Sequence, residues 1–270
     1  MDLVRGISES LAGRVGFLDM NVFTLKEVQE HIPDSFRMHW LKGGFPDACL
    51  TEEPRLNFDW FENYTRSLIE RDLPSLGIQL DPIQFRRLWT MLVLSHSDIL
   101  NMNKLASALG ASPHTVDRYI GILERSFLLR RLPPYFSNLK KRLVKSPKIY
   151  VRDSGLLHYF LRLLSFEDLT VSPHRGGSFE GYALEQIIQL VKLESPQVEA
   201  SYFRTADGLE IDLLLSNGEK KFPIEIKSKL SPGKEDIATL LKAQKLLGFR
   251  SAVVFCMGKA RYPIAEGIEC

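Results

Sequence analysis

The stretch Gly208-Leu-Glu-Ile-Asp212, followed thirteen residues after Asp212 by Glu225-Ile-Lys227, decides how the second half of this chain folds. In both parts, charged residues alternate with isoleucine or leucine. This alternation is typical of a β-strand, whose successive side chains point to opposite faces. On the first strand, the two acids are expected to share one face, with Ile211 and Leu213 on the other. On the second strand, the acid and the lysine are expected together, with the isoleucines packing away from them.

Turn and helix signals around these strands predict a single α/β unit. Asp207-Gly208 and Asn217-Gly218 are strong hairpin signals, because such turns favour glycine, asparagine and aspartate. The order helix, three-strand meander, helix, strand predicts a central mixed sheet. The expected elements are a helix over 179–193, strands over 202–205, 210–215 and 222–227, a helix over 231–247 ended by Gly248, and a strand over 251–256.

Acids on neighbouring strands suit a divalent metal. If the meander pairs normally, Asp212 and Glu225 converge, and carboxylate oxygens are the ligands that Mg²⁺ and Mn²⁺ prefer. Such a metal acidifies a bound water and stabilises charge on a phosphate, and Lys227 would lie beside that water or phosphate. Glu180 borders the apolar face of the preceding helix and is the candidate third acid, whereas Glu185 is expected to face solvent. The alternative is an exposed sheet face with cross-strand charge pairs.

Helical patterns fill the first half of the chain. Thr24 is expected to cap a short helix over 25–31, with Glu27 completing a capping box. Two helices joined by a short turn and followed by two strands predict a winged helix-turn-helix. The expected elements are helices over 59–70, 83–94, 103–109 and from 113 onward, strands over 127–132 and 148–151, and a helix over 155–164. Residues 172–177, which contain proline and two glycines, are the expected domain boundary.

A basic run indicates a local surface for nucleic acid. Between Arg125 and Tyr150 the chain has no aspartate or glutamate, although its overall net charge is only +2. Polar residues at the start of the third helix are expected to meet a DNA groove, and lysines and an arginine of the wing are expected to contact phosphates. The alternative is a solvated loop on a protein-binding module. The candidate nucleic-acid-binding residues are His114, Arg118, Lys140, Lys141, Arg142 and Lys145.

The composition is that of a folded protein and excludes several classes. The 270 residues are 44% hydrophobic and 25% charged, which is incompatible with a largely disordered chain. Apolar runs are too short to cross a bilayer, and residues 1–5 lack the apolar segment of a secretory signal. The three cysteines have no paired spacing, which favours free thiols over zinc ligands. We therefore expect a cytoplasmic protein without a membrane partner.

Several segments, taken in order, resemble a widespread prokaryotic family of AAA-type ATPases whose C-terminal domain has no known function. They are Trp40-Leu-Lys-Gly-Gly-Phe-Pro46, Tyr64 to Asp72, the helix-turn-helix, Lys145 to Leu156, Phe179-Glu180 and Glu225-Ile-Lys227. The resemblance covers nearly the whole chain. It implies that residues 9–15 correspond to the end of the ATPase domain, in which Arg14 would sense nucleotide. The chain has no phosphate-binding loop of the G-x-x-x-x-G-K-[ST] type, so ATP is expected only if a missing core is supplied.

The resemblance also implies a division of the chain and a fold for its end. It implies an ATPase remnant over 1–40, a helical linker over 41–80, a winged helix-turn-helix domain over 81–171, and a restriction-endonuclease-like domain over 172–270. Glu180, Asp212, Glu225 and Lys227 resemble the motif positions of that nuclease fold, with Ile211 standing where proline is usual. The overall class is α/β units within an α+β chain.

Three functions remain open on the sequence. The first is a DNA-binding module with an Mg²⁺- or Mn²⁺-dependent nuclease-type site, in which Asp212, Glu225 and Glu180 hold the metal and Lys227 positions water or phosphate. The second is a non-catalytic module that binds DNA or a protein partner. The third is a nucleotide-dependent switch that works with an ATPase half supplied in trans.

Overall fold

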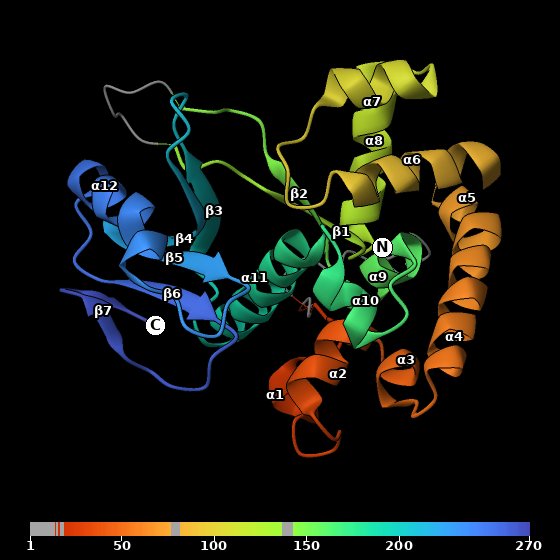
Figure 1. The fold of residues 1–270 in the computed structure, drawn as a ribbon. Helices are drawn as coiled ribbons and strands as arrows, with labels where there is room; N and C mark the ends of the chain where they lie inside the picture. The colour runs from red at the N-terminus through yellow and green to blue at the C-terminus, as the bar shows by residue number, and fades with distance from the viewer. Residues whose placement is uncertain (1–13, 15, 17–18, 77–81, 137–142) are drawn as a thin grey trace.

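The computed structural model describes residues 14, 16, 19–76, 82–136 and 143–270 (Figure 1). The chain is an α+β protein in which a mainly helical first part precedes a mixed sheet. Helices of the first part are α1 (Leu25–Val28), α2 (Ser35–Lys42), α3 (Pro46–Leu50), α4 (Pro54–Ser67), the π-helix η2 (Leu68–Asp72), α5 (Leu73–Ser75), α6 (Pro82–Leu94), α7 (Met102–Leu109) and α8 (Pro113–Arg125).

The second part begins with a small two-stranded sheet. Its elements are β1 (Leu129–Leu132), β2 (Lys148–Val151), α9 (Ser154–Leu161), α10 (Phe166–Val171), α11 (Arg175–Glu194), β3 (Glu199–Arg204), β4 (Glu210–Asn217), β5 (Lys220–Lys227), the 3-10 helix η3 (Lys234–Ile237), α12 (Ala238–Leu247), β6 (Ala252–Cys256), β7 (Pro263–Ala265) and β8 (Ile268–Glu269). Most predicted helices and the central strands are confirmed within a few residues, but the predicted helix over 231–247 is divided into η3 and α12. The prediction missed α2, α3, α5, α10, β7 and β8.

Capping residues fix the helix-turn-helix. The side chain of Asn101 accepts the Lys104 N–H ahead of α7, and Gly110 ends that helix with φ 64°. The Ser112 hydroxyl then accepts the Thr115 N–H at the start of α8. These contacts satisfy backbone groups that a helix end leaves open, so the short turn between α7 and α8 is set by local sequence. Strands β1 and β2 follow as an antiparallel pair.

The C-terminal sheet has six strands in the order β3-β4-β5-β6-β8-β7. The β3–β4 and β4–β5 pairs are antiparallel and the β5–β6 pair is parallel, which confirms the predicted mixed sheet. Gly208 and Gly218 have φ of 89° and 59°, so both predicted hairpin turns use glycine in the left-handed region. Helix α11 packs on one face of the sheet, and α12 packs on the other.

Helix α11 begins at Arg175, four residues before the predicted start, so Gly176 and Gly177 lie inside its first turn. A Cβ at Gly177 would lie 2.6 Å from the Ser97 hydroxyl, and one at Gly181 would lie 2.3 Å from the His96 ring. Gly177 and Gly181 are therefore explained by the close approach of α11 to the segment after α6, whereas a Cβ at Gly176 would have no neighbour within 4 Å. The prediction read Gly176 and Gly177 as loop residues because glycine also favours turns.

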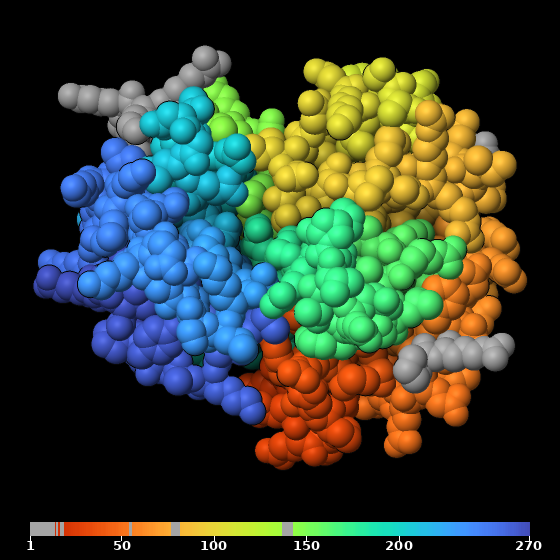
Figure 2. Space-filling view, viewed as in Figure 1, coloured from red at the N-terminus to blue at the C-terminus, as the bar shows by residue number. Residues whose placement is uncertain are grey.

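The helical part and the sheet are extensively joined. Trp40 of α2 is fully buried and packs with Phe179 of α11, and its indole donates to the Ser178 hydroxyl at 3.0 Å. Two residues of the connection from β1 to β2 also form bridges to the sheet: Pro134 pairs with Tyr202 of β3, and Leu143 pairs with Thr205 just after β3. Figure 2 shows the α6–α8 region in yellow and the C-terminal region in blue as two lobes with a notch between them. No helix in the described parts of the chain has the length and hydropathy that a membrane crossing requires.

Candidate metal-binding site

A β-bulge in β4 lies at the centre of the predicted site. Ser201 pairs with Leu214 and Phe203 pairs with Ile211, so β4 has one residue more than β3 between these pairs. The alternation of faces is therefore broken. Ile211 packs in the core beneath α12, whereas Leu213 packs in the core beneath α11. The prediction that these two side chains share a face is wrong, because strand alternation alone does not reveal a bulge.

The two central strands separate at Asp212. The β4–β5 ladder ends at the pair Leu213–Ile224, and in a regular ladder Asp212 and Glu225 would pair next. Instead the Asp212 carboxylate accepts the Ile226 N–H at 2.8 Å and so satisfies a backbone donor that the ladder leaves open. Strand β5 continues alongside β6 through Lys227. Because β4 and β5 are no longer paired beyond Leu213 and Ile224, the carboxylates of Asp212 and Glu225 can approach each other there.

Ile224 and Ile226 pack against α11, which confirms the prediction that they point away from Glu225 and Lys227 on β5. The Lys227 ammonium donates to Glu225 Oε1 at 2.5 Å. The second oxygen, Oε2, is buried and has no hydrogen-bond partner. A buried carboxylate oxygen without a partner is costly, and a cation is one group that would satisfy it.

Glu180 reaches the same region from α11. Its Oε1 accepts the Tyr150 hydroxyl at 2.6 Å and the Lys148 ammonium at 2.9 Å. Lys148 also pairs with Glu210 Oε1 at 2.5 Å. Neither Lys148 nor Tyr150 was predicted as a site residue. They are two positions apart on strand β2, so their side chains share a face. This two-residue spacing was the sequence signal that could have placed both residues at the site.

Electrostatics link the three acids. Burial and then the charge of Asp212 raise the pKa of Glu225 to about 8, and the charge of Glu180 adds to this shift. Burial and then Asp212 likewise raise the pKa of Glu180 to about 7. Burial also raises the pKa of Asp212. For Lys227, burial alone would lower the pKa, but the charges of Glu225 and Asp212 raise it above its ordinary value. The predicted quartet therefore shares one electrostatic environment.

The three carboxylates could hold a metal ion, but two of them already contact lysine ammonium groups. The unpartnered Glu225 Oε2 and the three mutually repelling carboxylates suit a hard divalent cation. Within the described ranges, however, no three acids, histidines or cysteines are arranged as a ready set of metal ligands. Glu180 is engaged by Lys148, and Glu225 is engaged by Lys227. A metal held by these residues would have to replace at least one of those ammonium contacts.

The raised pKa of Glu225 predicts a pH dependence of stability. A carboxyl whose folded pKa lies above its unfolded value favours folding below the unfolded pKa, and this contribution is lost as the pH rises through the folded pKa. For Glu225 the window runs from 4.5 to about 8. Without added metal, Glu225→Gln should therefore raise the melting temperature by roughly 5 °C near pH 8.5 and by much less near pH 5.

The control for this measurement is Glu194→Gln at the exposed end of α11. Its melting temperature should follow that of the unmodified protein at every pH. An equal effect of Glu225→Gln at both pH values would contradict the assigned shift.

Glu185 was predicted to face solvent, and that prediction is wrong. Its side chain is only 2% exposed and accepts hydrogen bonds from the guanidinium groups of Arg130 and Arg152. Burial alone would raise the pKa of Glu185, but the charges and hydrogen bonds of the two arginines lower it below its usual range. This cluster joins β1 and the segment after β2 to α11.

Some cations of the basic run between Arg125 and Tyr150 form ion pairs with acids of the protein. Arg130 pairs with Glu185, Arg131 pairs with Asp117 and Glu124, and Lys148 pairs with Glu180 and Glu210. Among the predicted nucleic-acid contacts, His114 and Arg118 are exposed on α8, and Lys145 is exposed before β2. Lys140, Lys141 and Arg142 lie outside the described residues. Arg14, the predicted nucleotide sensor, is exposed in a turn.

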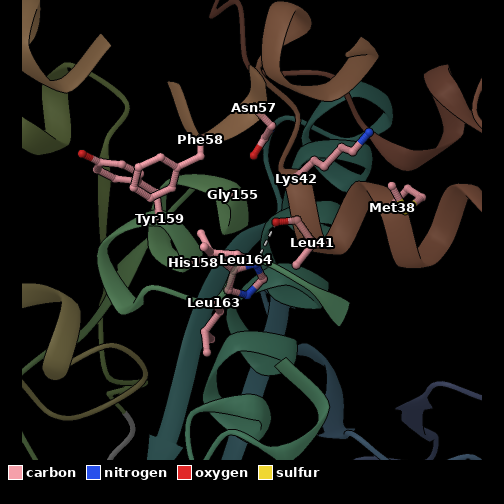
Figure 3. A pocket seen from close by; sticks show the side chains of 10 residues that line it. All are labelled: Met38, Leu41, Lys42, Asn57, Phe58, Gly155, His158, Tyr159, Leu163 and Leu164. Carbon is pink, nitrogen blue, oxygen red and sulfur yellow. Dashed lines mark hydrogen bonds between the residues drawn. The ribbon is translucent and has the colours of Figure 1, made fainter. Parts of the chain in front are cut away.

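A second group of chemistry-bearing side chains lies beside a small cavity between α2 and α9 (Figure 3). His158 Nδ1 lies 2.9 Å from the Leu41 carbonyl, and His158 Nε2 lies 2.6 Å from the Ser178 hydroxyl. The cavity volume is only about 30 Å³, which is the space of about one water. Burial lowers the pKa of His158 to about 4, so the ring is neutral. This group joins α2, α9 and α11 and leaves no room for a substrate.

Comparison with known proteins places these residues in two regions of unknown function. The family model "Domain of unknown function (DUF8612)" matches residues 33–167, which is half of the chain. The model "Domain of unknown function (DUF4143)" matches residues 175–270 and so includes the four predicted site residues. Lys148 and Tyr150 belong to the first region.

Two curated relatives match the chain at 34% identity over 271 residues. They are uncharacterized proteins of Mycobacterium bovis (strain ATCC BAA-935 / AF2122/97) and Mycobacterium tuberculosis (strain ATCC 25618 / H37Rv). The alignment covers 99% of this chain and 58% of each relative, so the chain spans a little over half of their length. No solved structure matches the chain.

Proposed function

This chain belongs to the family of the domain of unknown function DUF8612, and from its union with a DUF4143 region we propose that it binds DNA and carries a metal-dependent phosphodiesterase site. The observation that carries the proposal is the meeting of Asp212 and Glu225 where β4 and β5 separate, with Glu225 Oε2 buried and unpartnered. Convergent acids beside a lysine are the groups that phosphoryl chemistry requires.

Each acid has a separate task in this proposal. Asp212 and Glu225 would hold an Mg²⁺ or Mn²⁺ ion, and Glu180 would complete its ligands from α11. When bound, such an ion acidifies water and stabilises charge on the phosphate. Lys227 would position the attacking water or a phosphate oxygen, because its ammonium is next to Glu225 and 29% exposed. The Ile226 N–H fixes the orientation of Asp212.

The surrounding fold supports a nucleic-acid substrate. A helix, a three-strand meander, a helix and a parallel strand are the arrangement expected of a restriction-endonuclease-like domain. Three helices followed by a two-stranded antiparallel sheet fit a winged helix. His114 and Arg118 near the start of α8 are available to DNA. ATP and an AAA-type partner domain remain part of the proposal only through the resemblance of the sequence.

A plasmid-cleavage assay tests the proposal. The protein should nick or cut DNA with Mg²⁺ or Mn²⁺, and EDTA should prevent cleavage. Asp212→Asn keeps the acceptor for the Ile226 N–H but removes a charged ligand, so its activity should fall to background. Equal cleavage by both proteins would identify a contaminating nuclease and reject the site.

A non-catalytic module is the second candidate. It is favoured by the ion pairs that engage Glu180 and Glu225 in the described structure. In that case DNA binding would weaken with salt and no metal would promote cleavage. A nucleotide-binding measurement on this chain addresses the third alternative. ATP binding by the chain alone would contradict a switch that depends on an ATPase half supplied in trans, because the sequence has no phosphate-binding loop.

A further inference from the structure

The ammonium of Lys148 is buried and belongs to a different part of the chain from its two acidic partners. It comes from β2, in the DUF8612 region, yet its partners are Glu180 on α11 and Glu210 on β4. Its side chain is only 4% exposed. The same ammonium lies 5.8 Å from the centre of the Tyr202 ring. A buried ammonium is costly unless its partners are well placed, and here both carboxylates belong to the sheet domain.

The net charge of the acidic site depends on Lys148. Metal ligands must be ionised, and in that state Glu180, Glu210, Asp212 and Glu225 supply four negative charges. The paired cations are Lys148, Lys227 and Arg204. Four negative and three positive charges leave a net charge of −1. Without Lys148 the net charge becomes −2, which matches one divalent cation, and Glu180 is released as a ligand.

We propose that Lys148 occupies a cation position at the acidic site and thereby limits its affinity for a divalent metal. This inference rests on the proposed function, since it concerns the same site. The ammonium holds Glu180 Oε1, which would otherwise face the metal, and it repels an approaching cation. The absence of a ready ligand set among the described acids is consistent with this occupancy.

The position of Lys148 depends on the helical part of the chain. Strand β2 pairs with β1, and Lys148 itself forms a bridge to Ile99 after α6. Tyr150, from the same strand, donates to the same oxygen of Glu180. A ligand that shifts the helical part away from the sheet would withdraw the ammonium and the hydroxyl together. Metal binding and that ligand would then strengthen each other by the same factor.

Direct titration with Mn²⁺, followed by electron paramagnetic resonance, tests the proposal without any cleavage readout. Lys148→Met keeps the apolar stem of the side chain and removes its charge. We expect it to bind Mn²⁺ at least about tenfold more tightly than the unmodified protein. Lys242→Met, at an exposed position of α12, should leave the affinity unchanged. Lys148→Arg keeps the charge and should also show no tightening.

The outcomes separate this proposal from the proposed function. If the unmodified protein binds Mn²⁺ and Lys148→Met binds it equally or more weakly, Lys148 does not occupy a cation position, but the metal site stands. If only Lys148→Met binds Mn²⁺, the lysine assignment holds and the unmodified chain is not a metalloenzyme in this state. If neither binds, both proposals fail. Circular dichroism verifies folding, and Lys148→Gln replaces the methionine variant if that variant does not fold.

Discussion

Lys227→Met should lower metal-dependent DNA cleavage by about 100-fold or more while leaving metal binding intact. The ammonium of Lys227 is the charged group next to Glu225 that remains partly exposed, so it is the group that meets a water or a phosphate oxygen. Removing a positioned acid, base or charge at a reacting phosphate typically costs about 10²–10³ in rate. Methionine keeps the apolar stem of the side chain and removes only its charged end, so most of the packing beside β6 is retained.

The measurement combines cleavage rates with Mn²⁺ binding for the same variant. Because Lys227 repels a cation, its loss should leave the Mn²⁺ affinity equal or higher. Asp212→Asn is the matched contrast, since it should lower both affinity and cleavage. Unchanged cleavage by Lys227→Met would remove this lysine from the mechanism, and lost Mn²⁺ binding would indicate a structural role instead.

Glu185→Ala should destabilise the protein by about 3–5 kcal/mol, because it leaves two guanidinium groups without their buried partner. Arg130 is 22% exposed and Arg152 is 12% exposed, so water satisfies them only in part. Arg130 lies on β1, Arg152 follows the last residue of β2, and Glu185 lies on α11. The loss should therefore weaken the junction between the helical part and the sheet domain.

Urea unfolding measures this effect as a lower midpoint at unchanged slope. Glu194→Ala, on the exposed last turn of the same helix, should change stability by less than about 0.5 kcal/mol. Glu185→Gln keeps hydrogen-bond acceptors and should fall between the two. A cost below about 1 kcal/mol for Glu185→Ala would mean that the arginines find other partners.

The elements that the sequence predicted well are those specified by nearby residues. Asn101, Ser112 and Gly110 cap helices within three residues of themselves, and Gly208 and Gly218 make tight turns. The predicted site residues of the sheet lie on adjacent strands joined by a short hairpin, so turn chemistry brings those strands together. Their metal-binding and nuclease roles stay predictions that the proposed experiments address.

The misplaced residues are those whose partners are remote in the chain. Glu185 was assigned to solvent because its helical neighbours are polar, yet Arg130 and Arg152 lie 55 and 33 positions away. Lys148 was counted in the basic run between Arg125 and Tyr150, but its partner Glu180 is 32 positions away. A one-residue bulge in β4 separated Ile211 from Leu213, and no local pattern marks it.

The sequence by itself determined most of the helices and strands, the hairpin turns, and the acid-and-lysine pattern of β4 and β5. These features depend on periodicity and on residues a few positions apart. Only the tertiary structure decided which charges are free and which are paired. A buried charge without a partner is costly, so a buried acid is stable only when an element packed against it supplies a cation. That selection depends on packing between distant segments, which strand and helix periods do not encode.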